Sequence, residues 1–176
     1  MSDSRCLIAY YSRKGQNYVG GGIVDLAVGN TEVAAAMICA ITGGDLLEIE
    51  AVKAYPADYQ EATDVARTEL RENARPELGN APEGIEGYDV VFLGFPNWWG
   101  TAPMPVFTFL DSYDFSGKTI VPFCTHEGSG LGRSERDVAT ACPGATVLEG
   151  LAIRGGAVHG AEESIRRWIE STRLTF

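Results

Sequence analysis

The chain has 176 residues, of which 45% are hydrophobic and 22% charged, values typical of one folded domain rather than a disordered segment. Its 14 basic residues against 24 acidic ones give a formal net charge of −10, which argues against a nucleic-acid partner because such proteins carry a basic face. No apolar run approaches the roughly 20 residues of a membrane span.

The four cysteines are widely spaced and form no C-x-x-C pair, so we expect reduced thiols and neither a disulfide framework nor a metal site. The first residues lack the charged and apolar regions of a signal peptide. Together these features predict a cytoplasmic protein.

Short apolar runs alternate with amphipathic stretches along the chain. In chain order, the predicted elements are a strand over residues 6–10, a helix over 33–41 capped by Asn30, a strand over 46–49, a helix over 58–73, a strand over 88–93, a helix over 103–110, a strand over 119–124, a helix over 133–141, a strand over 146–148 and a helix over 164–173. Pro122 argues against the full length of the fourth strand. Strands interleaved with helices indicate an α/β domain spanning residues 1–176, with a mainly parallel sheet and helices on both faces.

One segment, residues 15–29, breaks this alternation. It separates the first strand from its helix, where a connection of two to six residues is usual. Three consecutive glycines, 20–22, precede the apolar run 23–28. We expect this insertion to form a small extra strand or hairpin, and we expect it to act as a flap over a bound ligand.

Ligands of open parallel sheets bind beyond the carboxyl ends of the strands, so the loops after the first, third and fourth strands are the candidate site. The first loop covers residues 12–17 and resumes, after the insertion, at 29–31. Its hydroxyls, its glycine and the free N–H groups of a helix N-terminus suit a phosphate. The alternative is that Asn30 only caps the helix and that Arg13 and Lys14 are solvated.

The second loop, residues 94–103, contains the adjacent Trp98 and Trp99 between prolines and glycines. A loop has limited core in which to bury both indoles, so one of them is expected to stack on a planar ligand. The alternative is that the pair plugs the end of the sheet or forms a subunit contact.

The third loop, residues 125–132, is rich in glycine, which permits a tight turn with several amides directed at one ligand edge. It does not match G-x-G-x-x-G, because Arg133 occupies the last required position, and it does not match G-x-S-x-G. No G-x-x-x-x-G-K-[ST] occurs either. The motifs of dinucleotide dehydrogenases, hydrolases and P-loop nucleotidases are therefore missing.

Taken together, the three loops resemble those of the flavodoxin family, over nearly the whole chain. The resemblance rests on the runs 10–15, 94–101 and 128–130, of which Gly-Phe-Pro-Asn-Trp-Trp-Gly-Thr is the most specific. It implies a three-layer, flavodoxin-like open sheet of five parallel strands in the order 2-1-3-4-5. It also implies a single domain that holds FMN without a covalent bond and passes electrons.

On this resemblance, the insertion splits the family's phosphate loop of hydroxyl-x-hydroxyl-Gly-Asn-Thr. Ser12 takes the first hydroxyl position, Lys14 stands at the second, and Asn17 competes with Asn30 for the asparagine. The ring-binding loops map to 96–101 and 125–130, with Trp98 or Trp99 against the ring. The residues thereby assigned to FMN are Ser12, Arg13, Lys14, Gly15, Asn17, Asn30, Thr31, Pro96, Asn97, Trp98, Trp99, Gly100, Thr101, Thr125, His126, Glu127, Gly128, Ser129 and Gly130.

His126 and Glu127 depart from the small residues expected in the third loop. They either point to solvent, or His126 lies close enough to the flavin to couple its proton to the redox state, since its ordinary pKa is about 6.5.

The predicted function is electron transfer, with no catalytic acid, base or nucleophile in the protein itself. Its expected partners are redox proteins that bind briefly through a basic surface, and the chain is expected to be a monomer or a weak homodimer. An NAD(P)H-dependent FMN quinone reductase is the first alternative and a flavin-free interaction domain the second. A signalling receiver domain is disfavoured, because Gly94 and its neighbours stand where a phosphorylatable aspartate is needed.

Overall fold

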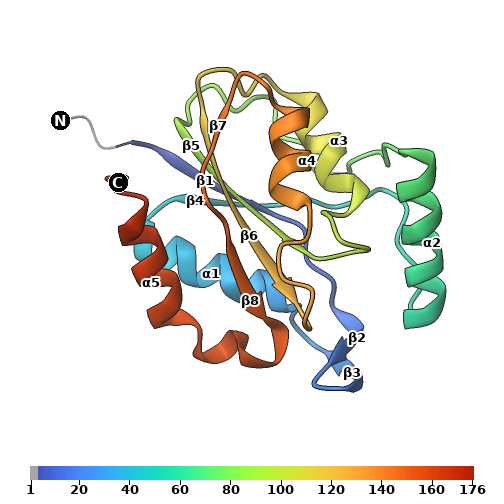
Figure 1. The fold of residues 1–176 in the computed structure, drawn as a ribbon. Coiled ribbons are helices and arrows are strands. Elements are labelled where there is room, and N and C mark those ends of the chain that lie inside the picture. The colour runs from blue at the N-terminus through green and yellow to red at the C-terminus, as the bar shows by residue number, and fades with distance from the viewer. Residues whose placement is uncertain (1–3) are drawn as a thin grey trace.

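A computed structural model describes residues 4–176 and shows a parallel sheet flanked by helices (Figure 1). The elements are β1 Cys6–Tyr10, β2 Gly15–Val19, β3 Gly22–Leu26, α1 Asn30–Thr42, β4 Asp45–Glu48, α2 Tyr59–Glu72, β5 Val90–Pro96, α3 Met104–Ser112, β6 Thr119–His126, α4 Ser134–Ala141, β7 Thr146–Val147, β8 Leu151–Arg154, the 3-10 helix η1 Gly155–Gly160, and α5 Glu162–Ser171. The sheet order is β4-β1-β5-β6-β7, with β8 also paired to β6. This is the predicted order 2-1-3-4-5, so the predicted fold class is confirmed.

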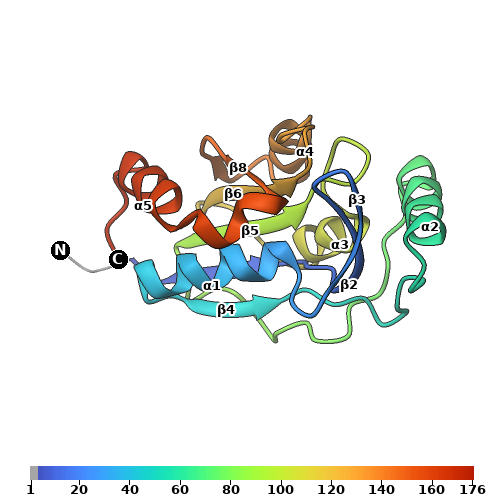
Figure 2. The ribbon, with the colours of Figure 1, turned by 90° about the horizontal axis from the view of Figure 1, so that it is seen from below.

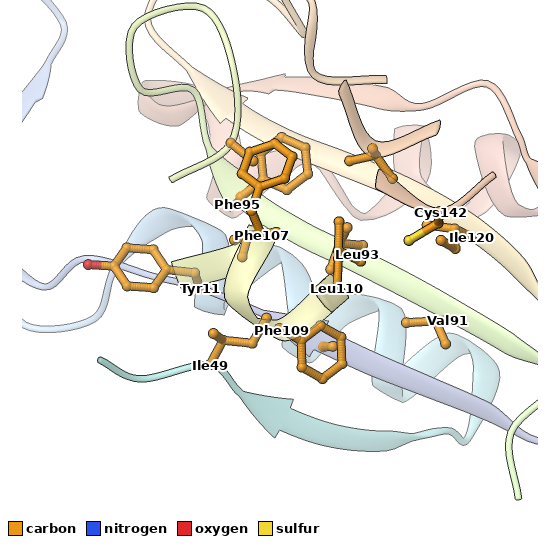
Figure 3. Close-up of a cluster of buried hydrophobic side chains, with 14 of the residues drawn as sticks. Tyr11, Ile49, Val91, Leu93, Phe95, Phe107, Phe109, Leu110, Ile120 and Cys142 are labelled. Carbon is orange, nitrogen blue, oxygen red and sulfur yellow. The ribbon is translucent and has the colours of Figure 1, made fainter. Parts of the chain in front are cut away.

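The two faces of the sheet are covered by different helices. Because side chains alternate along a strand, Val90 and Phe92 of β5 join one buried cluster with α1 and α5, whereas Val91, Leu93 and Phe95 join another with α3 and α4. Figure 3 shows the α3 side of the sheet, where apolar side chains of β5 and α3 pack together. None of the helices within residues 4–176 has the length and apolar character that crossing a lipid bilayer requires.

Two short strands, β7 and β8, share the edge of the sheet beside β6, and the sequence predicts only β7. β7 pairs with Thr119 and Ile120 of β6, and β8 pairs with residues 123–126. The break falls at Val121 and Pro122, where proline offers no N–H for a ladder. β8 leads directly into η1, which brings Gly155 to the carboxyl edge of the sheet.

Residues 15–26 form an antiparallel hairpin, β2–β3, as predicted for the insertion. The hairpin projects from the carboxyl end of the sheet (Figure 2). The chain leaves and returns at nearly the same place, because a Cβ added at Gly29 would overlap Ser12 Oγ and lie 2.6 Å from Arg13 O. The two ends of the segment that contains the hairpin therefore lie close together in space.

Helix α2 lies apart from the two layers of helices, at the side of the molecule (Figure 1). Asp58 caps its first turn, since its carboxylate accepts a hydrogen bond of 2.9 Å from Glu61 N–H. Only Ala62 and Ala66 of α2 are buried. This helix borders the cavity described next rather than covering the sheet.

Candidate functional site

A cavity of about 560 Å³ lies at the carboxyl edge of the sheet, where the loops after β1, β5 and β6 meet α2 and the hairpin. Its lining residues are Arg13, Asn17, Tyr18, Asn30, Thr31, Tyr59, Gln60, Ala62, Thr63, Ala66, Pro96, Asn97, Trp98, Trp99, Gly100, Thr125, His126, Glu127, Ser129 and Gly155. The volume lies within the range usual for small-molecule and cofactor sites.

One end of the cavity is formed by the N-terminus of α1. The predicted cap at Asn30 is wrong: α1 begins at Asn30, and Gly29 is the capping residue, without a side-chain bond. Ser12 Oγ supplies the cap instead, accepting a hydrogen bond of 3.1 Å from Glu32 N–H. The hydrogen bonds of residues 4–176 include no acceptor for the N–H groups of Asn30 and Thr31, which are thus available to an anion.

Polar side chains next to this helix end hold the first loop in shape. The hydroxyls of Thr31 and Thr125 are buried and share a hydrogen bond of 2.8 Å, which joins α1 to β6. The Arg13 guanidinium donates to three backbone carbonyls, those of Gln16, Pro56 and Ala57. Arg13 therefore ties the first loop to the segment before α2, although it also borders the cavity.

The second loop turns sharply between Trp98 and Thr101, which exchange backbone hydrogen bonds of 2.9 and 3.3 Å. Trp99 and Gly100 occupy the left-handed region, with φ of 57° and 87°. Asn97 holds this turn against the third loop, because its Nδ2 donates to Gly130 O at 2.7 Å while its Oδ1 accepts from Gly100 N–H. A tryptophan in the left-handed region is unusual, so the turn holds Trp99 at some conformational cost.

The two tryptophans have different surroundings. Trp98 packs edge-to-face against Tyr11 and Tyr55, at centroid distances of 5.3 and 5.1 Å. Trp99 is 46% exposed, and its Nε1–H donates to Thr63 O of α2 at 2.9 Å. The Arg67 guanidinium lies 5.1 Å from the centre of the Trp99 ring. Trp98 is thus fixed in an aromatic cluster, whereas Trp99 bridges the cavity rim to α2.

The third loop contributes His126 and Glu127, both of which line the cavity rather than pointing only to solvent. His126 Nδ1 accepts a hydrogen bond of 2.9 Å from Gly128 N–H, which leaves the proton of the neutral ring on Nε2. Burial, and then the positive charge of Arg154, lower the pKa of His126 below its ordinary value. His126 is therefore a neutral side chain near pH 7.

Six of the residues predicted to bind FMN are not part of the cavity lining: Ser12, Lys14, Gly15, Thr101, Gly128 and Gly130. Ser12 is engaged at the α1 cap, and Thr101 turns its hydroxyl to Asp137 at 2.7 Å. The other thirteen predicted residues meet around one cavity. Their contact with a cofactor stays a prediction.

Seven lining residues were missed by the sequence analysis: Tyr18, Tyr59, Gln60, Ala62, Thr63, Ala66 and Gly155. Five of them belong to α2, which the sequence predicts as a helix without indicating where it docks. The only available signal was the apolar face of α2 with its small alanines. Tyr18 lies in the insertion that was expected to act as a flap.

Comparisons with known proteins agree with this fold. The family model described as Flavodoxin matches residues 24–172. A Bacteroides eggerthii protein that carries a provisional flavoprotein name is 30% identical, with a TM-score of 0.80, over 98% of this chain and 100% of that one. No curated protein sequence matches the chain.

Two more distant structures are similar to this chain in fold. A Lactobacillus acidophilus flavoprotein in complex with FMN is 23% identical, with a TM-score of 0.67, over 89% of this chain and 97% of that one. An NADH:FMN oxidoreductase in its apo form is 13% identical, with a TM-score of 0.53, over 96% and 90% of the two chains.

The parallel sheet in the order β4-β1-β5-β6-β7, with helices on both faces and a cavity at its carboxyl edge, has the flavodoxin-like fold. The family match covers most of the sequence, and the chain belongs to the flavodoxin family.

Proposed function

We propose that this protein binds FMN without a covalent bond in the cavity at the carboxyl edge and carries electrons between redox partners. The observation that carries the proposal is the layout of the cavity, which has an anion-accepting helix end at one side and indole rings at another. FMN has an anionic phosphate and a flat ring, so it matches both features. The chain's membership of the flavodoxin family supports the same cofactor.

The residues suited to the phosphate are those at the start of α1. The N–H groups of Asn30 and Thr31 lie at the positive end of the helix dipole, and the Asn30 side chain borders the cavity. The charge of the nearby Arg13 adds to this attraction, although its donors are engaged by backbone carbonyls.

The residues suited to the ring are Trp98 and Trp99, which both line the cavity. Trp99 is 46% exposed and borders the cavity, so its indole can stack on a ligand there. When bound, FMN supplies the redox chemistry, and the protein supplies binding, orientation and electrostatics.

The acidic charge of the chain suits an electron carrier. Each carboxylate about 10 Å from the ring opposes the negative charge of reduction by roughly 0.4 kcal/mol in water, which is roughly 18 mV for one electron. The net charge of −10 therefore favours a low potential. The same charge attracts a redox partner with a basic contact surface.

The test is titration of the purified protein with FMN, followed by absorption and fluorescence. We expect binding of one FMN per chain with quenched flavin fluorescence. A colourless protein that is indifferent to FMN would exclude the proposal and favour a flavin-free interaction domain. Mixing the FMN complex with NAD(P)H separates the carrier from the reductase, since a carrier oxidises NAD(P)H only at a slow background rate.

His126 is expected to couple the midpoint potential to pH. Negative charge placed in the cavity by reduction raises the pKa of His126 from its lowered value, so reduction takes up a proton at pH values between the pKa of the oxidised protein and the higher pKa of the reduced protein. The potential then rises as the pH falls, with a slope of up to about 59 mV per unit for one electron and one proton. Measured between about pH 5.5 and 8, His126→Ala is expected to lack this contribution. Superimposable curves for the native protein and the variant would reject the coupling.

A further inference from the structure

The β2–β3 hairpin spans the cavity from α2 to the loop after β6. Near its base, Gln16 Oε1 accepts a hydrogen bond of 2.8 Å from Tyr59 N–H, at the start of α2. At its tip, Gly20 N–H donates to Glu127 Oε2 at 3.2 Å. Between these anchors, Asn17 and Tyr18 face the cavity. We call residues 15–26 the strap.

Glu127 joins the strap to two other segments. Its Oε1 accepts a hydrogen bond of 3.0 Å from Gly156 N–H in η1, and its backbone carbonyl accepts one of 3.1 Å from Arg154 Nη1. A Cβ added at Gly155 would lie 2.6 Å from Glu127 Oε1, so glycine at this position leaves room for the carboxylate. One carboxylate thus holds the strap tip to the wall formed by β6 and η1.

Apart from the bond to Glu127, the tip of the strap makes few contacts with the rest of the described chain. β3 is largely exposed and β2 partly so, and Tyr18, Ile23 and Val24 keep 45%, 52% and 38% of their surfaces in solvent. An isolated two-stranded hairpin is marginally stable in water. The other anchors, the bond between Gln16 and Tyr59 and the close approach of Ser12 to Gly29, lie at the base of the strap, so loss of the Glu127 bonds would free its tip.

We propose that Glu127 latches the strap over the cavity, and that release of this latch sets the rate at which FMN enters and leaves. The inference rests on the proposed function, because it assigns a role toward the cofactor proposed above. Glu127 acts here as a positioning residue, through the strap. The latch bonds join protein to protein, so they hold the strap in the free protein as well as in the complex.

The first test is Glu127→Gln, compared with Glu170→Gln, an equal charge change on the exposed face of α5. We expect Glu127→Gln to raise both the association and dissociation rates of FMN about tenfold, or about 1.4 kcal/mol. A side chain that only contacts bound FMN would change the dissociation rate alone. Rates equal to those of Glu170→Gln would overturn the latch.

The second test locks the strap without altering Glu127. A Cβ at Gly156 would lie 3.6 Å from Val19 Cγ1, within reach of a disulfide in the Val19→Cys/Gly156→Cys variant. Oxidation is expected to slow FMN exchange at least tenfold, and reduction to restore it. Exchange at the native rate in the oxidised variant would overturn the proposal.

Hydrogen exchange distinguishes failure of the latch from failure of the proposed FMN binding. In protein without FMN, Glu127→Gln is expected to accelerate amide exchange in residues 15–26 relative to Glu170→Gln, and unchanged exchange would overturn the latch. If the native protein fails to bind FMN while the amides respond, the proposed function fails and the latch holds the strap for another purpose.

Discussion

Trp99→Gly is expected to weaken FMN binding about tenfold while leaving the free energy of unfolding within about 1 kcal/mol of the native value. The lost stacking surface is worth about 1.4 kcal/mol, which is tenfold in Kd. The variant also loses the hydrogen bond to Thr63 O. Against these losses, glycine relieves the left-handed conformation of Trp99, whose φ is 57° and whose cost for a residue with a side chain is about 1–2 kcal/mol. FMN titration and denaturant unfolding measure the two effects.

Trp98→Ala is the matched comparison, and unlike Trp99→Gly it is expected to destabilise the fold. Trp98 packs against Tyr11 and Tyr55, so its removal is expected to lower the free energy of unfolding by about 3 kcal/mol. Trp99→Phe keeps a ring without the Nε1–H donor and should retain most of the affinity. Native affinity in Trp99→Gly would show that Trp99 does not contact the ring and would leave Trp98 as the stacking residue.

Deletion of residues 15–28 is expected to leave a folded protein that binds FMN at least about tenfold more weakly, or about 1.4 kcal/mol. The deletion joins Lys14 to Gly29, and the backbone around Arg13 already abuts Gly29. The joined sequence, Ser-Arg-Lys-Gly-Asn-Thr, forms an uninterrupted loop before α1. Binding weakens because the cavity loses Asn17 and Tyr18 from its wall.

Riboflavin, which lacks the phosphate, is the control for this deletion. The N–H groups at the start of α1 do not depend on the hairpin, so the ratio of FMN affinity to riboflavin affinity should be the same in both proteins. Unchanged FMN affinity in the deletion variant would contradict a role for the insertion in binding. A changed ratio would show that the hairpin contacts the phosphate end.

Most of the elements that were predicted correctly follow from local sequence patterns, namely apolar periodicity and turn residues. The continuous apolar run of β5 indicates a strand covered on both faces, and its side chains do divide between the two buried clusters. The loops at the carboxyl ends of β1, β5 and β6 follow from the parallel topology, so thirteen of the predicted residues meet around one cavity. The length of the insertion and its glycines likewise indicated the hairpin.

The failures share one cause, which is contact between segments distant in sequence. The cap of α1 comes from Ser12, whose hydroxyl accepts a hydrogen bond from Glu32 N–H twenty residues later, whereas the local pattern favoured Asn30. The split into β7 and β8 depends on which residues of β6 each segment pairs with. Such contacts leave no periodic signal in the segments that make them.

The sequence by itself determined the order of strands and helices, the insertion, and the three loops that carry the candidate site, because these depend on apolar periodicity and turn chemistry. Only the tertiary structure decided that α2 closes one side of the cavity and that Glu127 holds the hairpin on the other. Trp99 Nε1–H meets a backbone carbonyl of α2, and Glu127 meets backbone N–H groups of the hairpin and η1. Every residue but proline carries the same backbone donor, and every residue the same acceptor, so these partners have no distinguishing mark in the sequence.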